Sequence, residues 1–339
     1  MATTRTRLLT CAVFGMALTA CKDESPTQPS ATEELGQPSP DLAATANQWI
    51  TRADMPSGAR RDLATAVVTN AAGNSILYAI GGRTLTGGSL SRVQAYNTAT
   101  NTWSWKASLP VPLYWTNGAA VIGGKIYISG GANSSRAFTS ALYVYNPGTN
   151  MWARKRDMPN TTFRGVTGVI NNKLYVLTGC DQEDCMIFDP IAFYRYDPAT
   201  DLWETLPEPS NWHGWGMGGT IGGKLYVTGG SSQLDVYDPV ANSWSARAAM
   251  PLRRWMAAGA TLGAKLYVIG GFQENTDGSI VSAVRTTSVY DPATNSWTNK
   301  APMPSARFGI AASRVVVNGK ARLEVVGGAA PGNNLAFLP

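Results

Sequence analysis

Six short segments spread along this chain of 339 residues are marked by arginine, by aromatic side chains or by both. They read SGARRD, PLYWTNG, TTFRGV, NWHGWG, LRRWMA and SARFG. A guanidinium holds a carboxylate or sulfate through two parallel hydrogen bonds, and an aromatic ring stacks on sugar rings or apolar side chains. We therefore predict a binding site for a ligand with an acidic group, formed by the following residues: Arg61, Tyr114, Trp115, Arg164, His213, Trp215, Arg254, Trp255 and Arg307.

Two interpretations of these segments remain open. In the first, the side chains bind a glycan or a protein ligand. In the second, they pack between repeats, and each arginine pairs with a carboxylate of the neighbouring repeat. Four tryptophans in these segments lie outside the repeated Trp position described below, and this excess favours ligand binding: Trp115, Trp212, Trp215 and Trp255.

Residue sets typical of catalysis are missing from the sequence. The chain has one histidine, His213, which excludes a metal site built from several histidines. It also lacks a CxxC pair, a GxSxG nucleophile motif and a phosphate-binding glycine loop. We therefore expect a binding module without metal or cofactor rather than an enzyme. If the protein is an enzyme, His213 and Glu208 are the candidates for its general acid or base.

An internal repeat must position the six segments. Each unit contains a short apolar run closed by glycine, as in LYAIGG or LYVIGG, which is typical of a strand followed by a turn. Tyrosine and tryptophan recur seven residues apart in five units: Tyr96/Trp103, Tyr145/Trp152, Tyr196/Trp203, Tyr237/Trp244 and Tyr290/Trp297. A stretch of small residues, such as NGAAV, precedes the glycine run and suits a strand crowded around an axis. Each unit therefore predicts four strands.

This pattern resembles the kelch repeat, which implies an all-β fold, a six-bladed β-propeller over residues 45–339. The chain ends with Phe337 in the Tyr position of a sixth unit that lacks its Trp strand. Residues 45–56, with Trp49, supply that strand, so we expect an N-terminal strand to close the last blade. Loops between blades share one face with loops between second and third strands, and this face is the predicted binding surface. The resemblance also suggests an alternative function, a carbohydrate-active enzyme similar to the sialic acid mutarotases (N-acetylneuraminate epimerases).

The N-terminus has the layout of an export signal. Arg5 and Arg7 precede an apolar run, and the ending Leu18-Thr19-Ala20-Cys21 resembles a bacterial lipobox. The resemblance implies that residues 1–20 are a signal peptide and that Cys21 is lipidated; ordinary secretion with nearby cleavage is the alternative. Residues 21–44, rich in Pro, Ser and Thr, are expected to form a flexible tether. We expect a protein of the bacterial cell envelope, anchored in the outer membrane because Lys22 follows the cysteine.

The remaining expectations concern partners and the other cysteines. The formal net charge of +6 comes without a basic run, so nucleic acid is not expected as a partner. We expect a monomer that contacts the membrane through its lipid alone. Besides the lipidated Cys21, only Cys180 and Cys185 are left after export, which predicts a disulfide between them. The acidic loop 181–184 between them lacks the ligand spacing of a calcium site, and we expect it to be solvated.

The lipid anchor can be tested directly. Replacing Cys21→Ser should prevent lipidation and yield a soluble or uncleaved protein, because the thiol that carries the lipid is gone. Mass spectrometry of the mature N-terminus measures this, and an unmodified N-terminus at another residue of the unaltered protein would contradict the prediction.

Overall fold

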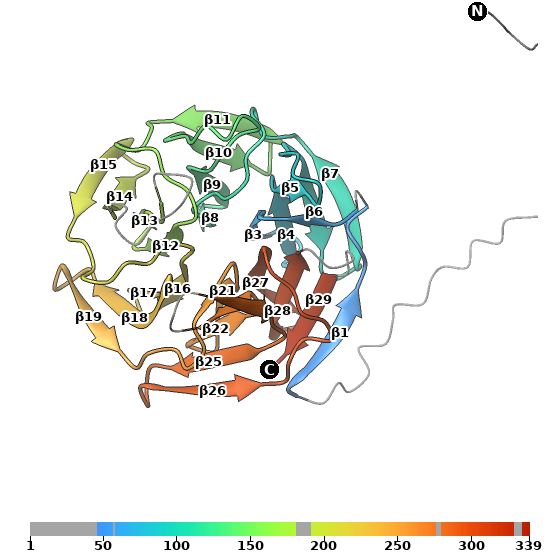
Figure 1. Cartoon of the computed structure of the whole chain (residues 1–339). Coiled ribbons are helices and arrows are strands. Elements are labelled where there is room, and N and C mark those ends of the chain that lie inside the picture. Colours follow the sequence, from blue (N-terminus) through green and yellow to red (C-terminus); the bar gives the residue numbers. More distant parts are fainter. Residues whose placement is uncertain (1–45, 57, 181–190, 276–278, 329–333) are drawn as a thin grey trace, which may run out of the picture. The chain divides into compact units, whose positions relative to one another are not determined.

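The computed structural model describes residues 46–56, 58–180, 191–275, 279–328 and 334–339 (Figure 1). The chain divides into two units, Met1–Pro40 and Asp41–Pro339, and the described residues all belong to the second. The predicted signal peptide, the lipidated Cys21 and the tether lie outside the described residues. Among those that are described, no helix is long and apolar enough to cross a membrane.

The described residues form six four-stranded antiparallel sheets arranged as blades around an axis (Figure 1). From the axis outward, blade one contains β3 (Ala64–Thr69), β4 (Ser75–Ile80), β6 (Val93–Asn97) and β7 (Thr102–Lys106). Blade two contains β8 (Ala119–Ile122), β9 (Lys125–Ser129), β10 (Leu142–Asn146) and β11 (Met151–Lys155). Blade three contains β12 (Val166–Ile170), β13 (Lys173–Leu177), β14 (Phe193–Asp197) and β15 (Leu202–Leu206). Blade four contains β16 (Met217–Ile221), β17 (Lys224–Gly229), β18 (Ser231–Asp238) and β19 (Ser243–Arg247). Blade five contains β21 (Ala258–Leu262), β22 (Lys265–Ile269), β25 (Thr287–Asp291) and β26 (Ser296–Lys300). Blade six contains β27 (Ile310–Val317), β28 (Lys320–Gly327), β29 (Asn334–Leu338) and β1 (Gln48–Arg52). This confirms the predicted all-β propeller with six blades.

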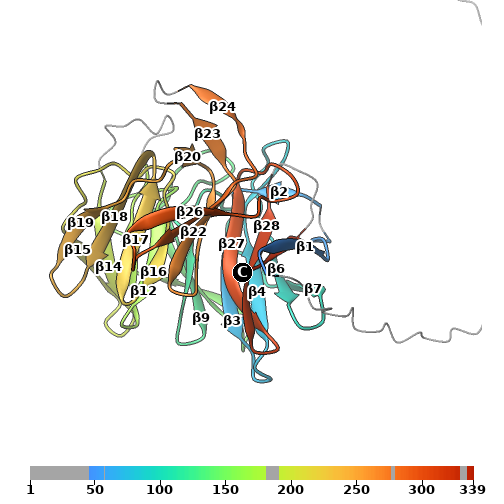
Figure 2. The same ribbon diagram turned by 90° about the horizontal axis from the view of Figure 1, so that it is seen from below.

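Two small sheets add to one face of the propeller. β2 (Arg60–Arg61) pairs with β5 (Arg83–Thr84) in blade one. β20 (Arg254–Trp255), β23 (Phe272–Glu274) and β24 (Ile280–Ala283) form a three-stranded sheet that rises above the blades (Figure 2). Both sheets lie on the face that carries the blade-to-blade segments.

The N-terminal strand closes the ring, as predicted. β1 pairs antiparallel with β29, and Trp49 lies opposite Phe337. The same register places Trp152 opposite Tyr145 in blade two. The Trp49 and Phe337 rings are 5.1 Å apart, close to the 5.0 Å between those of Tyr145 and Trp152. The last blade is therefore built like the others, although its strands come from both ends of the propeller.

Every repeated tryptophan holds the segment that leaves the preceding blade. Its indole Nε1 donates to a backbone carbonyl at 2.8–2.9 Å in all six blades, as Trp49, Trp103, Trp152, Trp203, Trp244 and Trp297 donate to residues 301, 53, 107, 156, 207 and 248 respectively. In five blades the Asn or Asp two positions before the tryptophan accepts the N–H of that same residue. The exception is Pro207, which has no N–H to donate. We call this pair of hydrogen bonds the Trp clamp.

The clamp explains a part of the repeat beyond its apolar residues. The Asn or Asp of each clamp has a left-handed backbone, as in Asn47 (φ 64°), Asn101 (φ 57°) and Asp201 (φ 56°). Asparagine and aspartate tolerate this region better than other residues with a side chain. In blades one to five the same side chain accepts a hydrogen bond from the tyrosine hydroxyl, at 2.6–2.7 Å. One side chain therefore joins the turn, the tyrosine strand and, in most blades, the neighbouring blade.

The core lies between adjacent blades. Buried apolar clusters join each blade to the next, as where Tyr78 of blade one packs against Tyr145 of blade two with ring centroids 5.6 Å apart. The innermost strands carry the small residues noted in the sequence, and they line a central cavity of about 260 Å³. The predicted crowding around the axis is therefore observed.

The closing strand yields a stability prediction. Trp49→Ala removes a half-buried ring and one bond of the Trp clamp, so unfolding should become easier by about 2–3 kcal/mol, below the cost of deleting a fully buried tryptophan. Trp105→Ala is the control, because Trp105 is 56% exposed. Chemical denaturation measures both variants. Equal stability of the two would contradict the shared sixth blade.

Candidate functional site

One residue from each blade stands at the upper end of the central cavity with a left-handed backbone. We call these six residues, whose φ lies between 54° and 63°, the mouth ring: Asp62, Trp115, Arg164, Trp215, Met256 and Gly309. Each directly precedes or nearly precedes the innermost strand of its blade. A left-handed backbone is uncommon for bulky residues and is found where the surrounding structure enforces it, often at functional sites.

Backbone hydrogen bonds link neighbouring members of the mouth ring across the blades. The N–H of Trp115 donates to Asp62, and that of Arg164 donates to Trp115. Gly216 donates to Arg164, Gly309 to Met256 and Asp62 to Gly309. These bonds, between 2.8 and 3.2 Å long, run around most of the cavity entrance. The ring is therefore held by the closure of the propeller, and it carries its side chains around one opening.

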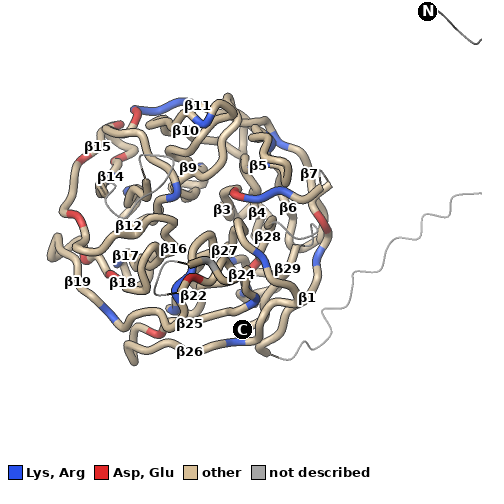
Figure 3. The backbone as a smooth tube through the Cα atoms, in the orientation of Figure 1, with Lys and Arg blue, Asp and Glu red and all other residues tan. Residues whose placement is uncertain are grey.

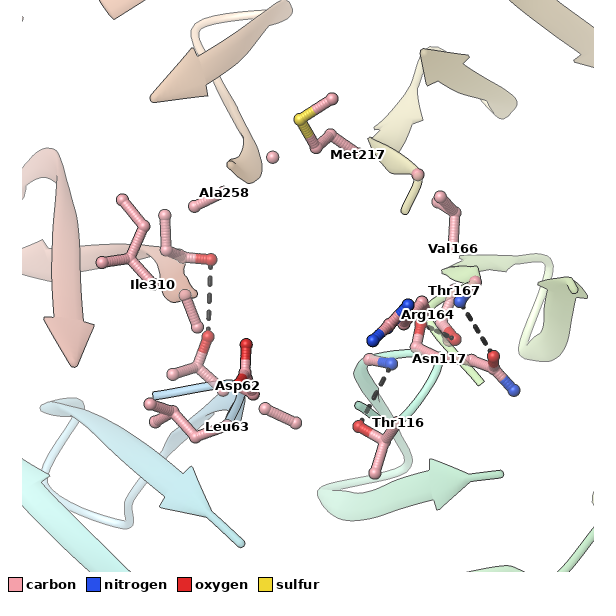
Figure 4. Close-up of a pocket in the computed structure, with 18 of the residues that line it drawn as sticks. Asp62, Leu63, Thr116, Asn117, Arg164, Val166, Thr167, Met217, Ala258 and Ile310 are labelled. Carbon is pink, nitrogen blue, oxygen red and sulfur yellow. Dashed lines mark hydrogen bonds between the residues drawn. The ribbon is translucent and has the colours of Figure 1, made fainter. Parts of the chain in front are cut away.

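Arg164 lies between two tryptophans of the mouth ring. Its guanidinium carbon is 3.5 Å from the ring centroid of Trp115 and 3.0 Å from that of Trp215. The side chain of Trp215 in turn packs edge-on against Trp255, with centroids 4.9 Å apart. Stacking on indole faces stabilises a guanidinium cation. Figure 4 shows Arg164 at the wall of the cavity, across from Asp62.

Asp62 is a buried carboxylate at the same opening. Its side chain is 2% exposed, and its Oδ2 lies 2.5 Å from Nε of Arg83 and 3.9 Å from Nε of Arg61. Burial raises the pKa of Asp62, while the positive charges of Arg83 and Arg61 act in the opposite direction. Arg83 also lies over the Trp115 ring, 4.4 Å from its centroid. Neither Asp62 nor Arg83 is among the binding residues predicted from the sequence.

The mouth carries an excess of positive charge. Three guanidinium groups, those of Arg61, Arg83 and Arg164, face one carboxylate among the described residues, that of Asp62. Figure 3 marks the backbone positions of the charged residues in the view of Figure 1. On the opposite face, turn lysines pair with the aspartates that follow the repeated tyrosines. The Lys173–Asp197, Lys224–Asp238 and Lys265–Asp291 distances are 2.7–2.8 Å. Among the described residues, guanidinium groups therefore outnumber carboxylates at the mouth.

The predicted binding residues divide into two groups in the structure. Those close to the mouth are Arg61, Tyr114, Trp115, Arg164, Trp215 and Trp255. Tyr114 is largely buried beneath Arg83 and packs against Trp115. The structure places Arg254, Arg307 and His213 elsewhere, as the second interpretation of the sequence allowed, because each occupies a buried slot two residues before its mouth-ring residue.

Arg254 shows what this slot does. Its side chain is fully buried and donates to the carbonyls of Gly270, Thr286 and Val268 at 3.0–3.3 Å. Arg60 makes the equivalent contacts in blade one, with the carbonyls of Gly81, Arg92 and Ala79. Burial lowers the pKa of each guanidinium to about 10. Arg307 is 3% exposed, and its Nε donates to Ser305. Arg60 and Arg254 therefore hold backbone carbonyls rather than line the opening.

His213 fills the same slot in blade four with different chemistry. Its Nε2 lies 2.8 Å from Oδ2 of Asp235 and its Nδ1 lies 3.3 Å from the carbonyl of Gly229. The imidazole is fully buried, so it does not meet a ligand at the mouth. Glu208, the other candidate acid or base, is exposed. It lies in the segment between blades three and four and does not line the central cavity.

Two further expectations concern metal binding and the cysteines. No cluster of three or more His, Cys, Asp or Glu side chains occurs within the described ranges. Cys180 is buried and disulfide-bonded. Its expected partner Cys185 and the acidic loop 181–184 lie outside the described residues, so the Cys180–Cys185 pairing and the solvated loop stay predictions.

Comparisons with known proteins agree with this architecture. The model of the KLHDC2/KLHL20/DRC7 Kelch-repeats domain matches residues 43–230, and that of the Kelch motif matches residues 253–304. A solved structure titled "Structure of YjhT" is similar, with a TM-score of 0.68 and 17% sequence identity. The match covers 83% of this chain and 95% of that chain. At this identity the likeness shows a common fold alone.

The buried slot makes a prediction that separates structural from exposed arginines. Arg254→Ala should lower the free energy of unfolding by about 2–4 kcal/mol, because buried carbonyl oxygens lose their donors. Arg61→Ala removes a partly buried side chain at the mouth. It should change the free energy of unfolding by less than about 1 kcal/mol. Thermal or chemical denaturation measures both. If Arg254→Ala unfolds like the unaltered protein, the slot has no structural role.

Proposed function

Because the chain belongs to the kelch-repeat family and its propeller brings Trp115, Arg164 and Trp215 together at one opening, we propose that it is a ligand-binding module for a ligand with an acidic group. The mouth of the central cavity is the proposed site. A glycan is the first candidate ligand and a protein the second, and binding involves no chemical step.

The stacked Arg164 carries this proposal. Stacking on Trp115 and Trp215 engages the faces of the guanidinium, whereas its N–H donors lie in its plane and are directed at its edges. A planar group held in this way is oriented for two parallel hydrogen bonds to a carboxylate or sulfate. The surrounding excess of guanidinium groups favours an anionic ligand over a cationic one.

The size of the cavity limits the part of the ligand that enters it. Its volume of about 260 Å³ lies just below the usual range of small-molecule sites, about 300–1,000 Å³. A single acidic sugar residue or one acidic side chain suits this space, and the rest of a larger ligand would lie across the aromatic rings of the mouth.

We further propose that the propeller is exported and held at the bacterial cell envelope through a lipid on Cys21. The sequence Leu18-Thr19-Ala20-Cys21 and the Pro/Ser/Thr-rich stretch after it support this proposal. A binding module on a tether would meet ligands outside the inner membrane, where acidic glycans and envelope proteins are accessible.

A second candidate function is a carbohydrate-active enzyme similar to the sialic acid mutarotases. Asp62 favours it, because burial raises the pKa of this carboxyl at the mouth and such a carboxyl can act as a general acid. Neither His213 nor Glu208 lies at the mouth to serve with it. NMR exchange between the anomers of N-acetylneuraminate tests this function, and an uncatalysed exchange rate in the presence of the protein would exclude it.

The binding proposal predicts that mouth residues fail in different ways. Arg164→Ala should weaken binding of acidic glycans by about 2–5 kcal/mol, because a desolvated charge pair loses one partner, and should barely change binding of neutral analogues. Trp115→Ala should weaken both, since stacking does not depend on ligand charge. Isothermal titration against N-acetylneuraminate, galacturonate and galactose measures these changes.

The control for lost positive charge is Arg247→Ala, whose side chain is exposed on the outer strand of blade four. It should bind all three probes like the unaltered protein. If Arg164→Ala binds the acidic probes as tightly as Arg247→Ala does, the mouth is not the acidic site.

A further inference from the structure

A second cavity lies between blades four and five, on the same face as the mouth. Its volume is about 920 Å³. We call it the blade 4–5 pocket. Its walls come from the segments that leave blades three and four, from the start of β18 and from β23: Asn211, Trp212, Ser232, Arg253, Gln273 and Glu274.

Two departures from the repeat create this pocket. In blade four, β17 and β18 are joined by a tight turn with a register shift at Thr228/Gly229, whereas long segments join the second and third strands of blades two and three. In blade five, the corresponding segment forms β23 and β24, which rise above the blades (Figure 2). Blade four therefore has only a short connection on this face, and blade five adds the β23–β24 strands beside it. Irregularities of this kind often occur next to binding sites.

An arginine and a glutamate fix one wall of the pocket. Arg253 donates through Nε and Nη2 to the carbonyl of Gly230, at 3.1 and 2.7 Å. Its Nε also lies 3.2 Å from Oε2 of Glu274, and both side chains are mostly buried. The pair joins blade four to β23 and cancels its own charge. The pocket is therefore polar without being charged, unlike the mouth.

A buried dyad fixes the other polar wall. Nδ2 of Asn211 donates to Oδ2 of Asp235 at 2.9 Å, and the same oxygen lies 2.8 Å from Nε2 of His213. Asp235 is 3% exposed and His213 is fully buried. Because the amide nitrogen is held from behind, the orientation of Asn211 in the pocket wall is set. His213 thus acts as a positioning residue.

Trp212 supplies an aromatic wall. Its indole packs so closely over two glycines that a Cβ on Gly214 or Gly230 would lie 1.9 or 2.6 Å from the ring. The buried Nε1 of Trp212 has no hydrogen-bond partner among the described residues. The ring also packs against the cluster of Phe163 and Cys180, which includes Trp115 and Trp215. Trp212 therefore connects the pocket to the mouth.

From this combination we infer that the blade 4–5 pocket is a saccharide subsite for a neutral, hydroxyl-rich sugar. An aromatic wall stacks on the apolar face of a sugar ring, while oriented amides, a serine and a paired Arg–Glu exchange hydrogen bonds with its hydroxyl groups. The absence of net charge in this lining selects against the acidic ligand proposed for the mouth. The inference stands on its own contacts and does not require the mouth to bind.

The experiment mixes the full protein with the methyl glycosides of galactose, glucose, mannose and N-acetylglucosamine. Saturation-transfer NMR detects binding of each sugar, and titration of the protein with the sugar measures its affinity. At least one of these sugars should bind. Ser232→Tyr, which fills the pocket without removing a described contact of its side chain, should weaken that binding about tenfold or more, as expected when a pocket is blocked. Gln273→Ala should weaken it less. Melting curves show whether each variant is folded.

Trp115→Ala provides the matched control, because it should weaken any sugar bound at the mouth and Trp115 does not line the pocket. It should bind the neutral sugar within a few-fold of the unaltered protein. The inference is overturned if none of the four sugars binds, or if Ser232→Tyr binds as the unaltered protein does. It is also overturned if Trp115→Ala alone abolishes binding, since the sugar then binds at the mouth. A failure of acidic ligands to respond to Arg164→Ala refutes the mouth proposal instead.

Discussion

The Trp clamp is the interaction on which the rest of the propeller depends. In every blade an indole N–H donates a hydrogen bond to the carbonyl of one residue in the segment that leaves the preceding blade. In five blades the N–H of that same residue donates to an Asn or Asp side chain. Because the same contact recurs from Trp49 to Trp297, the blades form a closed ring with uniform spacing. The clamp at Trp49 joins the first described strand to the segment that leaves blade five, and this strand completes the four strands of the last blade.

A closed ring allows backbone conformations that an open chain would avoid. The mouth ring holds Trp115, Arg164 and Trp215 in the left-handed region, at a cost of about 1–3 kcal/mol for each residue. Backbone hydrogen bonds between neighbouring blades offset this cost, and as a result large side chains from adjacent blades lie around one opening. The same ring position holds Gly309 in blade six, where no side chain projects. The proposed site is therefore concentrated on one side of the mouth.

Buried polar groups show how the repeat and the site share residues. The slot two residues before the mouth ring holds Arg60 in blade one and Arg254 in blade five, and both bind carbonyls. Blade four has His213 there, and the change from guanidinium to imidazole brings in Asp235 as its partner. That carboxylate then orients Asn211 in the wall of the blade 4–5 pocket. A deviation from the repeat thus links blade packing to a local polar site.

The sequence by itself determined the blade count, the closing strand and the face on which the blade-to-blade segments lie, because these follow from repeat spacing and from strand alternation along the chain. It also identified Trp115, Arg164 and Trp215, which exceed what the repeat requires. Only the tertiary structure decided which arginines are buried. Arg254 and Arg61 each belong to an Arg-Arg pair in a blade-to-blade segment, but Arg254 fills the buried slot and Arg61 lies at the mouth. The ion pair of Asp62 and Arg83 was also decided only by the tertiary structure, because the two residues come from separate segments that share no sequence pattern.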